Sequence, residues 1–155
     1  MTPFRFLFLL EWMCLLMFTP SYAHPQPHWV ELAGQRYDVE LALNDITRAH
    51  GLMFRDALAK HHGMLFIHDR QEPLAYWMKN CKISLDILFF DAQRHLVGQQ
   101  RGVPPCRDSD TCPAYPSQSP ARFVLEINAG EAERLHLHTG MTLKLDPRIP
   151  APDLR

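Results

Sequence analysis

Residues 83–90 read ISLDILFF and have the side-chain period of a β-strand. Apolar side chains at positions 83, 85 and 87 alternate with Ser84 and Asp86. From position 87 the run is apolar on both faces, as expected of a strand inside a packed core. We therefore expect a buried strand that carries one shielded carboxylate, Asp86.

Asp86 needs compensation in such a strand. A carboxylate shielded from water needs a cation or several hydrogen-bond donors, or its pKa rises and it is neutralised. Lys79, Lys82 and Arg55 are the cations that we expect near it. We interpret Asp86 first as a partner in a structural ion pair or as a turn-stabilising carboxylate. A site residue with a perturbed pKa is the alternative.

Residues 76–80 read YWMKN and place a Trp, a cation and an amide next to apolar residues. If residues 74–80 form a strand, Trp77 and Lys79 share one of its faces. We expect Trp77 in the core, because Trp is commonly well buried, and a ligand platform is the alternative.

The whole pattern predicts a mainly β fold, a β-sandwich or barrel-like single domain with a few short helices. Gly34 can turn a hairpin, and Asn44 or Asp45 can cap a short helix that ends at Gly51. Residues 102–121 hold five prolines and form a long loop, which in compact domains is often a binding segment. The expected strands are 29–32, 36–43, 63–67, 74–80, 83–90, 95–101, 122–128 and 141–145, and the expected helical turns are 45–50 and 130–137.

Residues 1–23 have the layout of a cleavable export signal. Arg5 gives a positive start, an apolar run follows, and small residues at positions 21 and 23 fit a signal peptidase site. We expect cleavage after Ala23 and a periplasmic or secreted protein, with an uncleaved anchor as the alternative. Glu11 interrupts the apolar run, which disfavours a membrane span. The expected organisation is a signal peptide at 1–23, one β-rich domain at 24–146 and a C-terminal tail at 147–155.

The charge of the mature chain is nearly balanced. Without the first 23 residues, 15 basic and 16 acidic side chains remain. This balance gives no electrostatic indication of a nucleic-acid partner or of an anionic membrane surface. We therefore expect no nucleic-acid binding and no stable membrane insertion after signal cleavage.

Short motifs along residues 30–145 match a known family in order. The motifs are Arg48–Arg55 (RAHGLMFR), Gly63–Phe66 (GMLF), Trp77–Asn80 (WMKN), Leu85–Ile87 (LDI), Pro105-Cys106, Cys112–Tyr115 (CPAY), and Leu125 with Asn128–Gly130 (NAG). They resemble the Domain of Unknown Function 192 family. The resemblance implies a compact, mostly β domain, often exported, without an established activity. The chain departs from the family pattern at Cys81, where threonine is usual, and at Ser84, where proline is common.

The cysteines of the mature chain predict one disulfide. Cys106 and Cys112 are six residues apart in a loop rich in turn formers, and an oxidising compartment favours their pairing. A bridge over so short a loop gains about 2 kcal/mol in the chain-entropy model. A redox pair is the alternative, without the two-residue spacing of oxidoreductase motifs. Cys81 is then expected to be a buried thiol rather than a nucleophile.

Metal binding is a further alternative. A His-x-His pair on a strand puts both rings on one face, and methionines near a thiol suit Cu(I). The methionines lie in apolar motifs typical of core packing, so we predict no metal site and no cofactor, with a copper-binding protein as the alternative. The residues considered are His61, His62, His68, His136, His138, Met53, Met64 and Met78.

Catalysis has weaker support. No nucleophile-elbow glycines surround Ser84, and no phosphate-binding glycine loop is found in the sequence. A hydrolase centred on Asp86 would need a second carboxylate, for which Glu126 is the best candidate. Such an extracytoplasmic hydrolase is kept as an alternative.

The function that we predict is a binding module for a small polar or anionic molecule, or for a segment of a cell-envelope protein. The competing interpretation is an internal polar network that holds the loop. Convergence of Arg55, Lys79 and Asp86 on an open cleft would separate the two. The candidate ligand-binding residues are Arg48, Arg55, Trp77, Lys79, Asn80, Asp86 and Tyr115.

Overall fold

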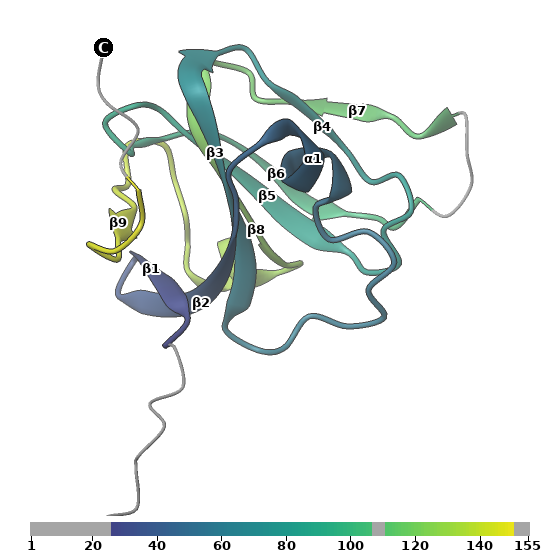
Figure 1. Ribbon diagram of the computed structural model, residues 1–155, viewed down its shortest axis with the longest axis horizontal. Helices are drawn as coiled ribbons and strands as arrows, with labels where there is room; N and C mark the ends of the chain where they lie inside the picture. Colours follow the sequence, from purple (N-terminus) through teal and green to yellow (C-terminus); the bar gives the residue numbers. More distant parts are fainter. Residues whose placement is uncertain (1–25, 107–110, 151–155) are drawn as a thin grey trace, which may run out of the picture.

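A curled seven-stranded sheet dominates the computed structural model, which describes residues 26–106 and 111–150 (Figure 1). The strand order is β6-β5-β8-β3-β2-β1-β9, and β4 and β7 form a separate two-stranded ribbon. The mainly β class is therefore confirmed. The expected signal peptide lies outside the described residues. The strands are β1 (His28–Leu32), β2 (Gln35–Ala42), β3 (His62–Glu72), β4 (Ala75–Trp77), β5 (Leu85–Phe90), β6 (Leu96–Val103), β7 (Ala114–Pro116), β8 (Ala121–Asn128) and β9 (Lys144–Leu145).

The strand predicted from residues 83–90 is β5, which lies inside the sheet between β6 and β8. All six of its residues are buried. Strand β8 is buried from Ala121 to Ile127 and pairs antiparallel with both β5 and β3. These central strands bury both faces because each face of the sheet carries its own apolar core.

The two faces are separated by side-chain alternation along the central strands. Leu88 and Leu125 are paired across β5 and β8 and belong to one core, which also includes Ile149 near the end of the described residues. Ile87 and Val124 belong to the second core, on the opposite face. Helix α1 (Asp45–His50) and the β4–β7 ribbon cover this second face (Figure 1).

Local sequence signals are confirmed at the first hairpin and at α1. Ala33 and Gly34 both have positive φ, 52° and 77°, which is the backbone of a two-residue hairpin turn. The Asn44 side chain accepts from the Thr47 amide at 2.9 Å, and Thr47 returns the contact in a capping box. Gly51 follows the last helical residue, as expected.

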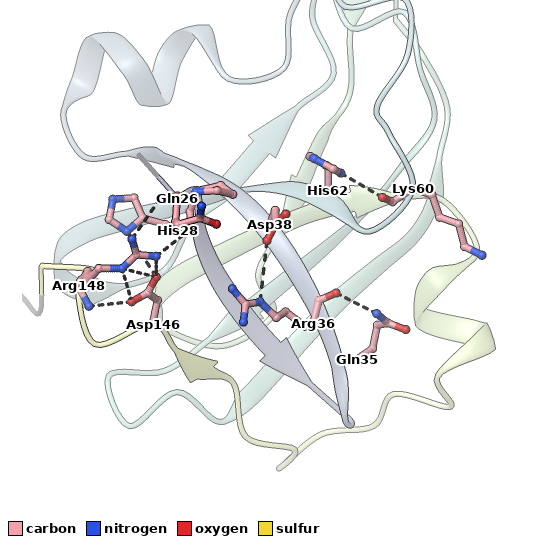
Figure 2. Close-up of polar contacts among 10 residues, drawn as sticks. Gln26, His28, Gln35, Arg36, Asp38, Lys60, His62, Asp146 and Arg148 are labelled. Carbon is pink, nitrogen blue, oxygen red and sulfur yellow. Dashed lines mark hydrogen bonds and ion pairs between the residues drawn. The ribbon is translucent and has the colours of Figure 1, made fainter. Parts of the chain in front are cut away.

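Arg148 ties together the two ends of the described chain (Figure 2). Its guanidinium pairs with Asp146 and donates to the carbonyls of Gln26 and Pro27 at 3.1 and 2.9 Å. Ile149 is buried in the first core. The packed part of the chain therefore continues beyond residue 146, where the tail was expected to begin.

The predicted disulfide joins Cys106 to Cys112, and Cys81 is a buried free thiol. The second short helix, α2 (Glu131–Arg134), lies within the helical turns predicted after Gly130. Within residues 26–106 and 111–150, the protein has no helix of the length and apolarity that a membrane span requires.

Candidate functional site

A narrow pocket opens between α1 and the end of β4 and reaches down to β8. Its volume is about 30 Å³. Since a single water needs roughly 10–15 Å³ measured in this way, the pocket has room for only a few non-hydrogen atoms. Its polar, aromatic and sulfur-containing lining residues are Arg48, His50, Met53, Phe66, Tyr76, Trp77, Lys79, Cys81 and Glu126.

Glu126 is the acidic residue of this pocket. Strand β8 places it opposite Ile87 on one side and Met64 on the other, so it points into the second core. Only 4% of its surface is exposed, and no residue of the described ranges donates a hydrogen bond to its carboxyl group. Burial raises the pKa of Glu126 to about 8. At neutral pH the carboxyl is therefore mostly protonated.

Cys81 and Tyr76 share the pocket with Glu126. Burial, and then the nearby Glu126 carboxylate, raise the pKa of the Cys81 thiol to about 11. The same two causes raise the pKa of Tyr76. Its hydroxyl lies 3.0 Å from Nε2 of His68, whose own pKa is lowered by burial. A thiol so rarely ionised is a poor nucleophile, so the buried-thiol interpretation of Cys81 agrees with its surroundings.

The mouth of the pocket is aromatic and cationic. Trp77 is 51% exposed, so the expectation that it lies in the core is wrong. Strand β4 ends at Trp77, and the Lys79 ammonium sits 5.2 Å from the centroid of its ring. No ion pair or hydrogen bond joins the Lys79 side chain to another described residue. Phe54 is 56% exposed and lines the neighbouring cleft, and its ring contacts the ring of His50, which lines the pocket.

Arg48 is part of the pocket wall, but its guanidinium already forms hydrogen bonds and an ion pair with neighbouring residues. It donates to the carbonyls of Ile67 and Leu43 at 2.7 and 3.1 Å, and pairs with Asp45 at 2.7 Å. These contacts fasten α1 to β3. The main role of Arg48 is thus to position the wall of the pocket.

Asn80 and Tyr115 lie beside the pocket and are not in its lining. Asn80 has a positive φ of 58°, accepts the Phe54 amide through its carbonyl at 2.8 Å and borders a neighbouring open cleft. Tyr115 lies opposite Tyr76 in the β4–β7 ribbon. Both residues therefore shape the elements that carry Phe54 and Tyr76.

The expected cationic compensation of Asp86 is wrong. Arg55 forms a bidentate ion pair with Glu40, in which two guanidinium nitrogens lie 2.5 and 2.8 Å from the two carboxylate oxygens. Lys82 forms an ion pair with Asp56. Asp86 instead accepts two backbone amides at 2.7 Å, from Gly102 and Ala132. Buried carboxylates that accept several N–H groups need no cation. Asp86 thereby connects β6 to the start of α2.

Asp86 and Glu126 cannot act as a catalytic carboxylate pair, because they lie on opposite faces of the sheet. Asp86 is paired with Ile127, whose side chain belongs to the first core, whereas Glu126 is paired with Ile87 in the second core. The convergence of Arg55, Lys79 and Asp86 that a cleft would have required is also not found. Of the three, Lys79 alone lines the pocket.

The methionines considered for copper act mainly as packing residues. Met64 and Met78 are buried in the second core together with Cys81, and the sulfur of Met53 accepts from Asn80 at 3.9 Å. In the described part of the chain, no three His, Cys, Asp or Glu side chains are arranged to hold a metal ion.

The sequence analysis did not place Glu126, Tyr76 and Phe54 in the candidate binding site, although it named Glu126 as a catalytic partner of Asp86. The one signal for Glu126 was a lone acid within the apolar run 123–127, the same signal that drew attention to Asp86. Phe54 carries no sequence signal of exposure. Its positive φ of 66° and its surface position follow from the loop that joins α1 to β3.

Comparisons with known proteins place this chain in a family. The family model DUF192, described as Uncharacterized ACR, matches residues 28–145. A crystal structure of a candidate transcription regulator from Sinorhizobium meliloti 1021 is similar, with 33% identity, a TM-score of 0.68, and coverage of 76% of this chain and 92% of that one. A protein of unknown function from Novosphingobium aromaticivorans DSM 12444 has 32% identity and a TM-score of 0.67, with 76% and 83% covered. No curated protein matches. The family match spans most of the chain, and this protein belongs to the DUF192 family.

Proposed function

We propose that this protein is an exported binding module that uses the pocket above Glu126, here called the Glu126 pocket, to hold one group of a partner's polypeptide segment. The observation that carries the proposal is a buried carboxyl without a donor among the described residues, at the base of an open pocket. Buried polar groups are normally hydrogen-bonded, so an unpaired one beside an opening marks a place for a ligand group.

The size of the Glu126 pocket favours a segment over a free small molecule. Pockets that enclose drug-sized ligands have volumes of roughly 300–1,000 Å³. At about 30 Å³, this pocket can take only the tip of a larger ligand. The rest of that ligand must lie on the outer surface.

The outer surface beside the pocket has the composition of a docking face. Trp77, Phe54 and Ile46 are 51%, 56% and 83% exposed. Ile46 and His50 are four residues apart on α1, and His50 contacts Phe54, which connects these side chains around the mouth. Exposed aromatic residues around a small pocket are typical of the anchor points of protein interfaces.

Export is part of the proposal because it defines the kind of partner. The signal-like segment of residues 1–23 and the Cys106–Cys112 bridge both fit an oxidising compartment outside the cytoplasm. A cell-envelope or secreted protein would then supply the segment.

A melting-temperature screen of the purified protein tests this function. The panel contains short peptides, organic acids, amines, sugars and nucleotides. A compound at about a hundred times its dissociation constant adds roughly 2.7 kcal/mol, which raises the melting temperature by several degrees. We expect peptides to shift the wild type and Lys60→Ala equally, and to lose their effect on Trp77→Ala and Lys79→Ala.

Lys60 is the matched control for Lys79, because it is an exposed lysine that borders a different cleft. Equal shifts in the wild type and Trp77→Ala would show that any binding occurs elsewhere. If no peptide in a broad panel shifts the wild type, the docking function is wrong.

A further inference from the structure

We infer that the Glu126 pocket selects a carboxylate group of the docked segment. This inference rests on the proposed binding function and adds the chemical class of the group that is recognised. It follows from the charges around the pocket, from the hydrogen-bonding capacity of its base and from its size.

Apart from Glu126, the ionisable side chains that line the pocket are either basic residues or weak acids that stay neutral. Helix α1 contributes Arg48 and His50, and the segment after β4 contributes Lys79. Tyr76 and Cys81 also face it, and burial keeps both protonated at neutral pH. Among the lining residues, Glu126 is therefore the acid that ionises nearest to neutral pH and would then repel an anion.

Glu126 offers a donor at the base of the pocket. Burial shifts its pKa to about 8, so below that pH its carboxyl keeps an O–H. A neutral buried carboxylic acid is a strong donor to an anionic oxygen, and such O–H···O⁻ contacts are short and strong. A carboxylate in the pocket would thus accept from Glu126 at the base while its charge lies near Lys79 at the mouth.

The pocket volume favours small anions over larger ones. A carboxylate has three non-hydrogen atoms, whereas phosphate and sulfate have five. A volume of about 30 Å³ equals the space of roughly two waters, which suits the smaller group. The order of affinity expected from size is therefore acetate before phosphate.

A nuclear magnetic resonance titration of the purified protein with small probes tests the inference. The reporter is the indole N–H signal of Trp77, assigned by its loss in Trp77→Phe. At pH 6 we expect acetate to move this signal saturably, and phosphate, acetamide and methylammonium to bind at least tenfold more weakly. At pH 9 about a tenth of Glu126 remains protonated, so acetate should bind about tenfold more weakly.

Two variants separate the contributions of base and mouth. Glu126→Gln keeps an N–H donor without an ionisable group, so acetate should bind it with nearly the same affinity at both pH values. Lys79→Gln should weaken acetate at both pH values and leave the tenfold pH ratio unchanged. N-acetylglycine and N-acetylaspartic acid N-methylamide then distinguish a terminal carboxylate from a side-chain carboxylate.

Several results would overturn the inference. Methylammonium binding that tightens at pH 9 would make the site one for amines. If the ratio of acetate affinities at pH 6 and pH 9 is the same in Glu126→Gln as in the wild type, Glu126 does not take part in recognition. Acetate that leaves the Trp77 signal unmoved at 100 mM would show that no carboxylate is held. In each case the peptide shifts of the melting screen decide separately whether the docking function survives.

Discussion

At the scale of single residues, the two carboxyl groups of the central strands have opposite surroundings. Asp86 is fully buried and accepts two backbone amides at 2.7 Å. Glu126 is almost as buried and has no donor among the described residues. The first is therefore a structural connector, and the second is available to a ligand.

Glu126→Gln should change how stability depends on pH. The pKa of Glu126 is about 8 in the folded chain and 4.5 for an ordinary exposed glutamate, so the folded state holds this proton more tightly. The associated stabilisation is complete below pH 4.5 and is lost as pH rises through 8. Between pH 5 and 8.5 we expect the variant to gain on the order of 4 kcal/mol in unfolding free energy relative to the wild type.

Urea unfolding at both pH values measures this difference. Comparison of the two proteins cancels the titration of groups that they share, such as His68. A difference in unfolding free energy that is the same at pH 5 and pH 8.5 would mean that Glu126 ionises normally in the folded protein.

Asp86→Ala should destabilise the protein strongly without affecting the pocket. It leaves the buried amide of Ala132 and the part-buried amide of Gly102 without an acceptor, which costs about 3 kcal/mol. Asp86→Asn keeps one acceptor and should cost about half as much. Asp45→Ala is the control, since Asp45 is 97% exposed in its pair with Arg48 and should change stability by less than about 0.5 kcal/mol. Similar losses for Asp86→Ala and Asp45→Ala would contradict the connector role.

The different surroundings of the Asp86 and Glu126 carboxyl groups could not be predicted from the sequence. Each is a lone acid in an apolar strand, LDIL and VLEI, and the local patterns are equivalent. Their environments depend on which distant backbone amides and side chains reach them, which the sheet pairing decides. Trp77 illustrates the same limit, because β4 ends there and leaves its ring outside the second core.

At the scale of elements, α1 is held by polar contacts rather than by an apolar face. None of its residues is buried. The Asn44 cap fixes its start, and Arg48 fastens it to the Ile67 carbonyl of β3. The wall of the Glu126 pocket therefore depends on a few hydrogen bonds.

Arg48→Met should loosen α1. It removes the donors to the Leu43 and Ile67 carbonyls while keeping much of the side-chain volume, at a cost of about 1–2 kcal/mol. The amide of Gly51, which is bonded to Thr47, should then exchange its hydrogen faster. Arg70→Met is the matched control, because Arg70 is 79% exposed in its pair with Glu72. Equal exchange rates at Gly51 in both variants would contradict this role.

Elements that are determined by residues close in sequence were predicted, whereas features that depend on pairing with distant strands were not. The first hairpin and α1 follow from Gly34 and from the Asn44 cap, within a few residues. The predicted strand 74–80 is shortened to β4, because Lys79 and Cys81 form isolated bridges to Cys106 instead of continuing the ribbon. The parallel pairing of β2 with β3 also has no local signal.

At the scale of the whole molecule, the first core is closed by the last described residues. Ile149 is 5% exposed, and Arg148 joins the two ends of the described chain (Figure 2). Sequence patterning missed this segment because a prolyl residue at 147 and a short polar stretch are typical of a tail.

A truncated protein that ends at residue 146 should be less stable than one that ends at residue 150. Loss of Ile149 from the core costs about 2 kcal/mol. The protein ending at residue 150 keeps the described contacts of Arg148 and Ile149 and should match the full chain. Thermal unfolding of the three proteins measures the difference. Equal melting temperatures would show that residues 147–150 do not contribute to the stability of the fold.

The most direct test of the site is the titration of its carboxyl by carbon-13 nuclear magnetic resonance in protein labelled at the glutamate side chains. We expect one carboxyl with a midpoint near pH 8 that disappears in Glu126→Gln, and a Trp77 indole signal that moves with the same midpoint. If every glutamate instead titrates below pH 5, Glu126 is solvated or compensated in the folded protein. The pocket would then have no protonated group at its base, and its assignment as the binding site would be wrong.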